Sequence, residues 1–256
     1  MLEKGKVDGY IRDLQTVAKV GGVRATFPWT MKVAAFLPLG VFKEVVESTD
    51  RILNYANESV ERYKRLLASG QAKNTLFTRL FESLGGEGEG EEGLSDREIR
   101  NDAQSFIVAG SDTTANTLTY LVWAVLRDKR IQERLVAELA SQLGEEEEIS
   151  DTSLRELPYL NQVIAESLRL YPAVPSGLPR VVPEKGAVLA GQYIPGGMTV
   201  TTQLHSLHRD AEVFINPEEF NPERWEQPSK EMKDAYMPFG AGSRSIPAPF
   251  RLSLFC

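Results

Sequence analysis

The sequence predicts a mainly α-helical protein with a small β region. Three observations lead to this fold class. Apolar residues recur every three or four positions in several long segments, which is the period of an amphipathic helix. Short β-like runs are confined to residues 186–203, where glycine and proline separate them. From Asp210 to Arg244 the chain is rich in proline, asparagine and aromatic residues, which is typical of ordered coil.

The first predicted helix covers residues 42–67. Charged residues fill one of its faces, so we expect the other face to be a single buried stripe. The stripe consists of Val45, Thr49, Ile52, Ala56, Val60, Tyr63 and Leu67.

The second predicted helix begins at Ser95, where Glu98 three residues later completes a capping box. It continues to about Arg127. Between Phe106 and Val125 it is apolar nearly all round, so we expect it to run through the middle of the domain. Two shorter amphipathic helices are predicted after it, at 129–143 and 157–170, and Pro172 and Pro175 stop the second of these.

Composition excludes several classes of protein. The 256 residues include 29 Lys+Arg and 36 Asp+Glu, and no basic stripe, so nucleic acid is not an expected partner. The single cysteine, Cys256, excludes a disulfide framework and a cysteine-based zinc site. No run of about 18 apolar residues is present, so no segment is predicted to span a membrane.

A polar cluster interrupts the second helix at residues 109–114, Ala-Gly-Ser-Asp-Thr-Thr. Gly, Ser, Asp and two Thr in succession are poor helix formers, and the hydroxyls can bond back to the carbonyl four residues earlier. One interpretation is a polar kink used only for packing. The other is a groove where a small ligand such as O2 meets Asp112 and Thr113, which relay protons to it. A buried carboxylate needs a partner, so a buried Asp112 favours the second interpretation.

A second group of residues predicts a structural network. Glu166 and Arg169 are three apart and share a helix face, but such a pair alone is common and usually exposed. The segment Pro-Glu-Arg-Trp at 222–225 adds Arg224 in rigid coil. Because a planar guanidinium pairs well with a carboxylate, we expect these three side chains to pin the coil to the helix.

The third group lies near the C-terminus, where residues 239–245 read Phe-Gly-Ala-Gly-Ser-Arg-Ser. Its two glycines permit a tight turn close to a flat ligand. Arg244 can meet an anionic group on that ligand.

In this order and at these separations, the three groups resemble the C-terminal half of a fungal-type cytochrome P450, a haem-thiolate monooxygenase. The resemblance runs over nearly the whole chain, up to Ser245. It implies a partial cytochrome P450 fold, mainly helical with a small β region. It also implies haem b (iron protoporphyrin IX) as cofactor, with electrons supplied from NADPH by a reductase partner.

The resemblance also implies roles for individual residues. Asp112 and Thr113 resemble the acid–alcohol pair that protonates bound oxygen, and Glu166, Arg169 and Arg224 resemble the structural network. Residues that resemble haem contacts are Ala109, Gly110, Arg180, Phe239, Gly242 and Arg244. Residues that would line the substrate are Phe106, Ala173, Val174 and Gly177.

The chain departs from the family at the iron ligand. The family holds its iron with a cysteine thiolate, and the place of that cysteine is taken by Ile246. Cys256, twelve residues after Arg244, is not expected to replace it. His205 and His208, one helical turn apart, are a further candidate pair, but two ligands without a third are more typical of surface residues. We therefore expect no metal ligand in this chain.

These observations predict one partial domain over 1–256, truncated inside the haem-binding loop. Helices occupy 1–94, and the oxygen-groove helix occupies 95–128. The Glu–Arg helix, small sheet, coil and start of the haem loop occupy 129–245. The tail at 246–256 matches nothing expected in the family, and we attribute it to a gene-prediction or splicing error.

Two functions remain open. The first is a haem-dependent monooxygenase that inserts one atom of O2 into a lipophilic organic substrate, with the chain as written expected to be inactive. The alternative is a catalytically dead fragment or an erroneous gene product, at most a helical interaction module.

The expected partners are a small lipophilic substrate and an NADPH–cytochrome reductase. The full-length form is expected at the endoplasmic reticulum membrane. This chain shows no anchor and would be cytoplasmic if expressed by itself. The apolar patch from Phe36 to Phe42 is either a loop packed on the core or a weak contact with a membrane surface.

Overall fold

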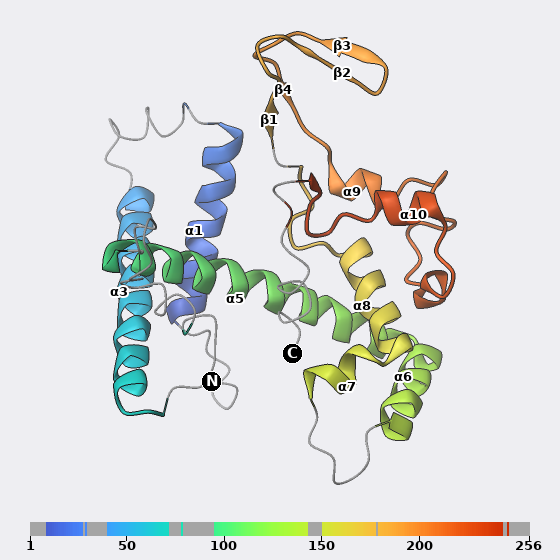
Figure 1. Cartoon of the computed structure of the whole chain (residues 1–256), viewed down its shortest axis with the longest axis horizontal. Helices are drawn as coiled ribbons and strands as arrows, with labels where there is room; N and C mark the ends of the chain where they lie inside the picture. The colour runs from blue at the N-terminus through green and yellow to red at the C-terminus, as the bar shows by residue number, and fades with distance from the viewer. Residues whose placement is uncertain are drawn as a thin grey trace, which may run out of the picture. The chain divides into compact units, whose positions relative to one another are not determined.

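The computed structural model describes residues 9–27, 29, 40–71, 78, 95–142, 150–177, 179–242 and 245. Within them the chain is mainly helical and carries two small two-stranded sheets, as the sequence predicts (Figure 1). Most of the apolar patch at Phe36 to Phe42 lies outside these residues.

The elements follow one another in a simple order. The helices are α1 (Gly9–Thr26), α3 (Gly40–Ala68), α5 (Asp96–Arg127), α6 (Lys129–Gln142), α7 (Asp151–Arg155), α8 (Pro158–Leu170), α9 (Leu204–Leu207), the 3-10 helix η2 (Pro222–Trp225) and α10 (Lys230–Ala235). The strands are β1 (Arg180–Val181), β2 (Ala187–Leu189), β3 (Gln192–Ile194) and β4 (Thr199–Val200).

Internal contacts divide the chain into two compact units, Met1–Asp112 and Thr113–Cys256, and the division falls within α5. The prediction of one partial domain stays a prediction. Among the described residues, no helix has both the length and the apolar character that a transmembrane segment needs.

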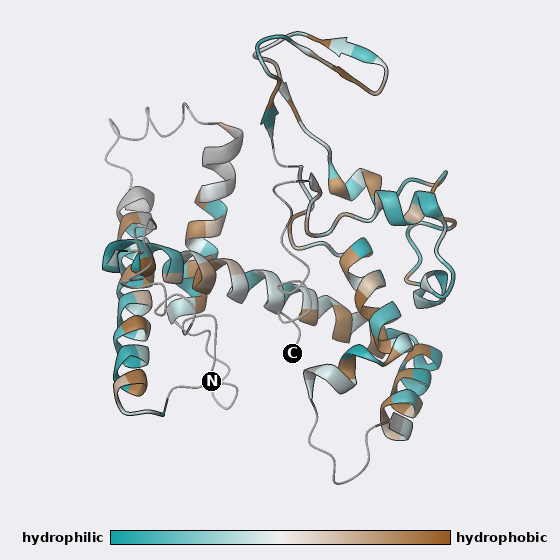
Figure 2. Ribbon diagram, viewed as in Figure 1, coloured by the Kyte–Doolittle hydropathy of each residue, from teal (hydrophilic) through white to brown (hydrophobic). Residues whose placement is uncertain are grey.

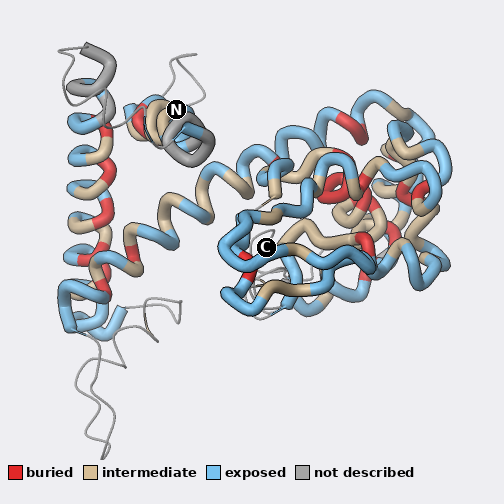
Figure 3. The backbone as a smooth tube through the Cα atoms, turned by 90° about the horizontal axis from the view of Figure 1, so that it is seen from above, coloured by how far each residue is buried: buried red, intermediate tan, exposed pale blue. Residues whose placement is uncertain are grey.

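In the first unit α1 packs against α3. The buried residues of α3 lie along one side of the helix, as its sequence period predicts (Figure 3). The predicted stripe is correct at Ile52, Ala56, Val60 and Tyr63, whereas Leu67, in the last turn, is exposed. Hydrophobic and hydrophilic residues alternate along α3 and α6, as expected for amphipathic helices (Figure 2).

Helix α1 lies in the stretch 1–94 that is predicted to be helical, although its bounds are not predicted, and an ion pair fixes it to α3. Arg51 donates from Nε to Asp13 Oδ2 at 2.8 Å and from Nη2 to Asp13 Oδ1 at 2.6 Å. This hydrogen-bonded pairing lowers the pKa of Asp13 below its ordinary value. Because both ends of the carboxylate are engaged, the pair fixes the position of one helix along the other.

The start of α5 confirms the predicted capping box. The Ser95 amide donates to Glu98 Oε2 at 2.8 Å, and the Glu98 amide donates to Ser95 Oγ at 3.3 Å. The first turns of α5 then contribute Ile99 and Ala103 to a buried cluster with Val60 and Tyr63 of α3.

Farther along α5 the described residues cover only part of the helix surface, and its expected course through the middle of a complete domain stays a prediction. Such a helix needs neighbours on every side, and the described residues supply them on only part of its circumference. Ala124 and Val125 are buried, but a set of large apolar side chains is between 41% and 63% exposed. This exposed set is Phe106, Leu118, Tyr120, Val122, Trp123 and Leu126.

The second unit has its core between α6 and α8. Ile131 and Val163, both fully buried, pack with Val125 and Tyr159, and Phe220 covers the cluster from the coil side.

The beginning of α8 is capped by α6, because its own N-cap residue, Leu157, makes no side-chain cap hydrogen bond. The Glu138 carboxylate of α6 accepts from the amides of Tyr159 and Leu160, each at 2.8 Å. The same carboxylate therefore satisfies two amides and joins the two helices.

Both sheets are antiparallel. Strand β1 pairs with β4 so that Arg180 lies opposite Val200, and β2 pairs with β3 as a hairpin. The hairpin turns at Ala190 and Gly191, which have φ of 49° and 77°. Two successive positive φ values match the twist of the strands, and glycine takes the second without strain.

The stretch predicted as ordered coil, from Asp210 onward, contains two short helices. Asn221 caps η2 by accepting from the Glu223 amide at 3.1 Å, and Ser229 caps α10 by accepting from the Met232 amide at 3.2 Å. These local side-chain caps explain how a segment with little helical periodicity forms turns of helix.

Leu126 near the end of α5 and Ile131 in α6 are both apolar but differ in burial, which leads to a stability prediction. We expect Ile131→Ala to lower the free energy of unfolding by about 2–5 kcal/mol, because it leaves a cavity in the core. Leu126→Ala should change it by no more than about 0.5 kcal/mol, because Leu126 is 63% exposed. Urea denaturation followed by circular dichroism measures both, and equal losses would contradict this account of the core.

Candidate functional site

Glu166 lies at the centre of a buried hydrogen-bond network in the second unit. It is on α8 and fully buried, as is Arg169 one turn later. Arg169 donates from Nε to Glu166 Oε2 at 2.9 Å and from Nη2 to Glu166 Oε1 at 2.8 Å. The two side chains thus form a bidentate pair on one face of the helix.

Three further donors reach the same carboxylate from the coil at η2. Arg224 Nε donates to Glu166 Oε1 at 3.0 Å, and the Asn221 amide donates to the same oxygen at 2.9 Å. Trp225 Nε1 donates to Oε2 at 2.9 Å. The structure therefore brings together Glu166, Arg169 and Arg224, and one carboxylate holds α8 and η2 in a fixed relation.

The remaining N–H groups of the two arginines bind carbonyls of the coil. Arg169 Nη1 donates to the carbonyls of His208 and Pro217 at 2.6 and 2.8 Å. Arg224 Nη1 donates to the carbonyl of Ile215 at 2.8 Å, and its Nη2 reaches those of Asn216 and Glu219, both at 3.3 Å. A segment with few backbone hydrogen bonds of its own gains its order from these donors.

A second group of polar contacts joins η2 to α6 and α8. Arg130 and Arg134 of α6 both donate to Glu223, at the second position of η2. Tyr159 of α8 donates its hydroxyl to Glu223 at 3.3 Å. Burial raises the pKa of Tyr159 to about 12, and the adjacent Glu223 charge adds to the effect. The hydroxyl therefore stays protonated and available as a donor.

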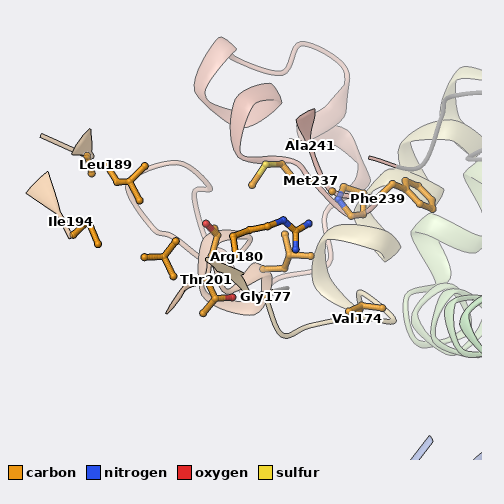
Figure 4. A pocket seen from close by; sticks show the side chains of 15 residues that line it. Val174, Gly177, Arg180, Leu189, Ile194, Thr201, Met237, Phe239 and Ala241 are labelled. Carbon is orange, nitrogen blue, oxygen red and sulfur yellow. The ribbon is translucent and has the colours of Figure 1, made fainter. Parts of the chain in front are cut away.

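The second unit also contains a cavity of about 700 Å³ (Figure 4). Its walls come from the segment after α8, from the strands and from the segment before the glycine turn. The lining residues are Val174, Gly177, Arg180, Leu189, Ala190, Ile194, Val200, Thr201, Thr202, Leu204, Met237, Pro238, Phe239, Gly240 and Ala241. Four of the predicted site residues are among them: Arg180, Phe239, Val174 and Gly177.

The segment after α8 is held close to α9 and β4. The His205 amide donates to the Pro175 carbonyl at 2.9 Å. At Gly177 an added Cβ would lie 1.9 Å from the Thr202 carbonyl oxygen and 2.2 Å from Thr201 Oγ1. This position therefore requires glycine for close packing of two backbones, a role that the sequence did not indicate.

Arg180 is the cation of the cavity. In Figure 4 its side chain extends between Thr201 and Gly177 on one side and Met237 and Ala241 on the other. Its Nη1 donates to the carbonyl of Pro179 at 3.0 Å, and among the described residues no carboxylate pairs with it. An arginine without a counter-charge in a mainly apolar cavity suits a ligand with an apolar body and an anionic group.

The glycine turn forms one end of the cavity wall. Gly240 has φ of 77° and donates its amide to the Met237 carbonyl at 3.0 Å, and Gly242 has φ of 73°. Both values lie in the region that favours glycine, as the predicted tight turn requires. Gly242 is not among the lining residues, and Arg244 lies outside the described residues.

These features suit one edge of the haem macrocycle, but the described residues provide no ligand set for its iron. The apolar walls and the unpaired guanidinium suit a flat macrocycle with a carboxylate side chain. At the iron, Ile246 stands in place of the cysteine, and both Ile246 and Cys256 lie outside the described residues. Within the described ranges, no group of three or more His, Cys, Asp or Glu residues is placed to bind a metal.

The polar cluster of α5 differs from its prediction in one respect. Asp112 is exposed in the structure, so the expectation of a buried carboxylate is wrong for the described residues. The physical reason is the incomplete cover of α5 described above. Ser111 Oγ donates to the Ile107 carbonyl at 2.6 Å, and the helix continues through the cluster without interruption.

The other predicted residues have mixed surroundings. Thr113 and Gly110 are half-buried, whereas Ala109 and Phe106 are exposed. Ala173 is half-buried and is not among the residues that line the cavity.

The burial of His208 differs from its prediction. The sequence favoured a surface residue, but its side chain is fully buried, and both ring nitrogens have backbone partners. It is therefore not available as a metal ligand, and only His205 of the pair is exposed.

Sequence reasoning missed several residues of this site. Thr201, Met237 and the hairpin residues Leu189 and Ile194 line the cavity although no motif includes them. The signal available for Met237 was its position just before the Pro-Phe-Gly turn. For the hairpin residues no local signal exists, because strand pairing and chain direction decide where they lie.

Comparison with known proteins identifies the family. Residues 1–245 match the cytochrome P450 family. The cytochrome P450 monooxygenase tazI of Aspergillus terreus is 46% identical over 96% of this chain and 49% of its own length. The cytochrome P450 monooxygenase orf2 of Aspergillus niger is 42% identical over 95% of this chain and 48% of its own length.

A solved structure gives the same result. The structure of a zebrafish cytochrome P450 with progesterone has a TM-score of 0.66 and 27% sequence identity, and the match covers 83% of this chain and 49% of that one. The fold and the Glu166 network thus define a partial P450 domain. The chain belongs to the cytochrome P450 family. It spans about half the length of the curated relatives that it matches.

The Glu166 network leads to a stability prediction with a matched control. We expect Glu166→Gln to lower the free energy of unfolding by about 3–5 kcal/mol, because it leaves buried guanidinium groups without their counter-charge. The same substitution at Glu226, whose pair with Arg134 is largely exposed, should cost less than about 1 kcal/mol. Denaturant titration of both variants is the measurement, and a near-neutral Glu166→Gln would contradict the network's structural role.

Proposed function

We propose that this chain is part of a haem-dependent monooxygenase, an oxidoreductase that inserts one atom of O2 into a lipophilic organic substrate. One observation carries the proposal. The buried carboxylate of Glu166 fixes the coil that leads to residues 237–241, and these residues form a wall of the cavity that contains Arg180. The names of the fungal relatives support the same reaction class.

Several residues of the chain would hold the cofactor, each through a different kind of contact. Arg180 would pair with one haem propionate, and Arg244 is proposed for another. Phe239 and Met237 would offer apolar surface that excludes water, while the turn at Gly240 would let the backbone approach the ring. When bound, haem supplies the oxygen chemistry itself, so the protein's contribution is position and environment.

Asp112 and Thr113 are proposed as the proton-relay pair, with Gly110 and Ala109 beside them as the floor of the oxygen groove. This role requires the carboxyl and hydroxyl groups to be shielded from bulk water when they act. Phe106, Ala173, Val174 and Gly177 are proposed to line the substrate side, because they are apolar or small.

A second candidate function rests on Ile246. Without a cysteine at this position the sequence lacks the thiolate that the family uses, and the chain as given would be a catalytically inactive fragment. In this case the Glu166 network and the cavity would persist as structural features.

The proposed partners of the complete enzyme are a small lipophilic substrate and an NADPH-dependent reductase. We propose the endoplasmic reticulum membrane as the location of the full-length form. Flotation of the complete protein with liposomes tests this location.

Haem binding leads to a prediction for Arg180. We expect Arg180→Gln to weaken binding of hemin by about 10- to 150-fold, because a charge-assisted hydrogen bond to a carboxylate contributes about 1.5–3 kcal/mol. Lys185→Gln removes an exposed cation that does not line the cavity and should leave binding unchanged. Titration of each variant with hemin, followed by absorbance, makes the comparison, and equal affinities would exclude Arg180 as a propionate partner.

The iron ligand gives the sharpest test of function. Protein purified with haem and reduced under carbon monoxide should lack the red-shifted Soret band of thiolate ligation. Ile246→Cys should restore that band, and Ile246→Ser serves as the matched control without a thiolate. A thiolate band in the unaltered protein would remove the case for an inactive fragment. Failure of all three proteins to bind haem would contradict the monooxygenase assignment for this chain.

A further inference from the structure

His208 connects the buried centre of the second unit to the wall of the cavity. It lies directly after α9, and its side chain is 0% exposed. Nδ1 of its ring is 3.0 Å from the carbonyl oxygen of Arg169, and Nε2 is 3.2 Å from the amide nitrogen of Met237. The ring therefore spans the distance between α8 and residue 237.

The two contacts determine the protonation state of the ring. A backbone amide can only donate, so Nε2 must accept from Met237 and carries no hydrogen. Nδ1 then carries the hydrogen of the neutral ring and donates it to the Arg169 carbonyl. Only this neutral tautomer satisfies both contacts at once.

Met237 is the first residue of the wall segment, residues 237–241, all of which line the cavity. The turn that follows is closed internally by the Gly240 amide on the Met237 carbonyl. The Met237 amide bond to His208 therefore joins this turn to α8, whose Arg169 belongs to the Glu166 network.

The charges around the ring disfavour an added proton. Arg169 of α8 and Arg209 of the coil are the neighbouring cations, and their carboxylate partners are Glu166 and Glu218. A further titratable neighbour among the described residues is Tyr236, which comes directly after α10 and whose ring stacks on His208 with centroids 5.9 Å apart. Among the described residues, no carboxylate forms a hydrogen bond with the ring.

Burial is the main cause that lowers the pKa of His208, to about 4, and the charges of Arg169 and Arg209 act in the same direction. The bond to the Arg169 carbonyl opposes this shift. Because the pKa is lower in the folded state, the neutral ring is favoured there, and the structure loses stability as the pH falls from about 6.5 towards 4.

We propose that His208 is a proton-controlled tether for the cavity wall. The neutral ring holds the Met237 amide and with it residues 237–241. When the ring takes a proton from solvent, Nε2 gains a hydrogen that points at the Met237 N–H, and this bond is lost. The bond from Nδ1–H to Arg169 remains, so the cavity wall is released while α8 keeps its contact. The tether belongs to the chain itself and does not depend on the proposed haem chemistry.

Hydrogen exchange of the complete chain tests the tether without any cofactor. The Met237 amide should be protected near neutral pH. After correction for intrinsic exchange, its opening should increase by up to about tenfold per pH unit as the pH falls below about 6.5, the slope for one proton. Amides within α8 provide the internal reference.

Two matched variants separate the tether from other acid effects. The chain contains 2 histidines, and the exposed His205 serves as the control. His208→Gln places an amide oxygen near the position of Nε2, where it can accept from Met237 but does not titrate in this range. We expect Met237 exchange to become independent of pH in His208→Gln and to follow the unaltered protein in His205→Gln.

Three results would overturn the proposal. The first is a Met237 amide whose protection does not change between about pH 7 and 4.5. The second is an acid-induced loss in His208→Gln equal to that of the unaltered protein. The third is an equal loss in the amides of α8, which would indicate global unfolding and not release of the cavity wall.

Discussion

One buried carboxylate organises the second unit of this chain. Glu166 accepts hydrogen bonds from Arg169 on its own helix and from Arg224, Trp225 and the Asn221 amide in the coil. The coil has few backbone bonds of its own, so its path depends on these contacts. Residues 237–241 of the cavity wall, with the glycine turn and the Met237 amide that binds His208, follow this coil in the chain. The path of this part of the candidate site therefore depends on one side chain on α8.

The energetic role of this centre is specificity more than net stability. Removing charged groups from water costs several kcal/mol per ion, and the mutual attraction offsets this only when every donor and acceptor is satisfied. Here Glu166 receives donors on both oxygens, and the spare N–H groups of Arg169 reach carbonyls of the coil. An alternative path of the coil would leave buried charges unpaired. The network therefore strongly disfavours alternative paths of the coil. This holds whether or not an apolar core at the same place would give a higher free energy of unfolding.

The sequence predicts well what depends on short-range pattern. The helices at 42–67 and 157–170, the capping box and the Glu–Arg pairing follow from spacing along the chain, because helix geometry fixes which side chains share a face. What it misses depends on distant neighbours. The ion pair that fixes helix α1 to α3 joins residues 38 positions apart, and the burial of His208 comes from segments far away in the sequence. Similarly, the apolar pattern around Asp112 predicts that this part of the helix is buried. It does not predict which residues pack against it.

The close approach at Gly177 limits how this cavity can diversify. Even a methyl group there would collide with the carbonyl of Thr202, which is backbone and cannot rotate away. Changes in cavity shape must instead arise at positions whose side chains have room, such as Val174 and Leu189, both more than 40% exposed. Selection for a new ligand, in nature or in directed evolution, would therefore act on the rim and leave this backbone crossing invariant.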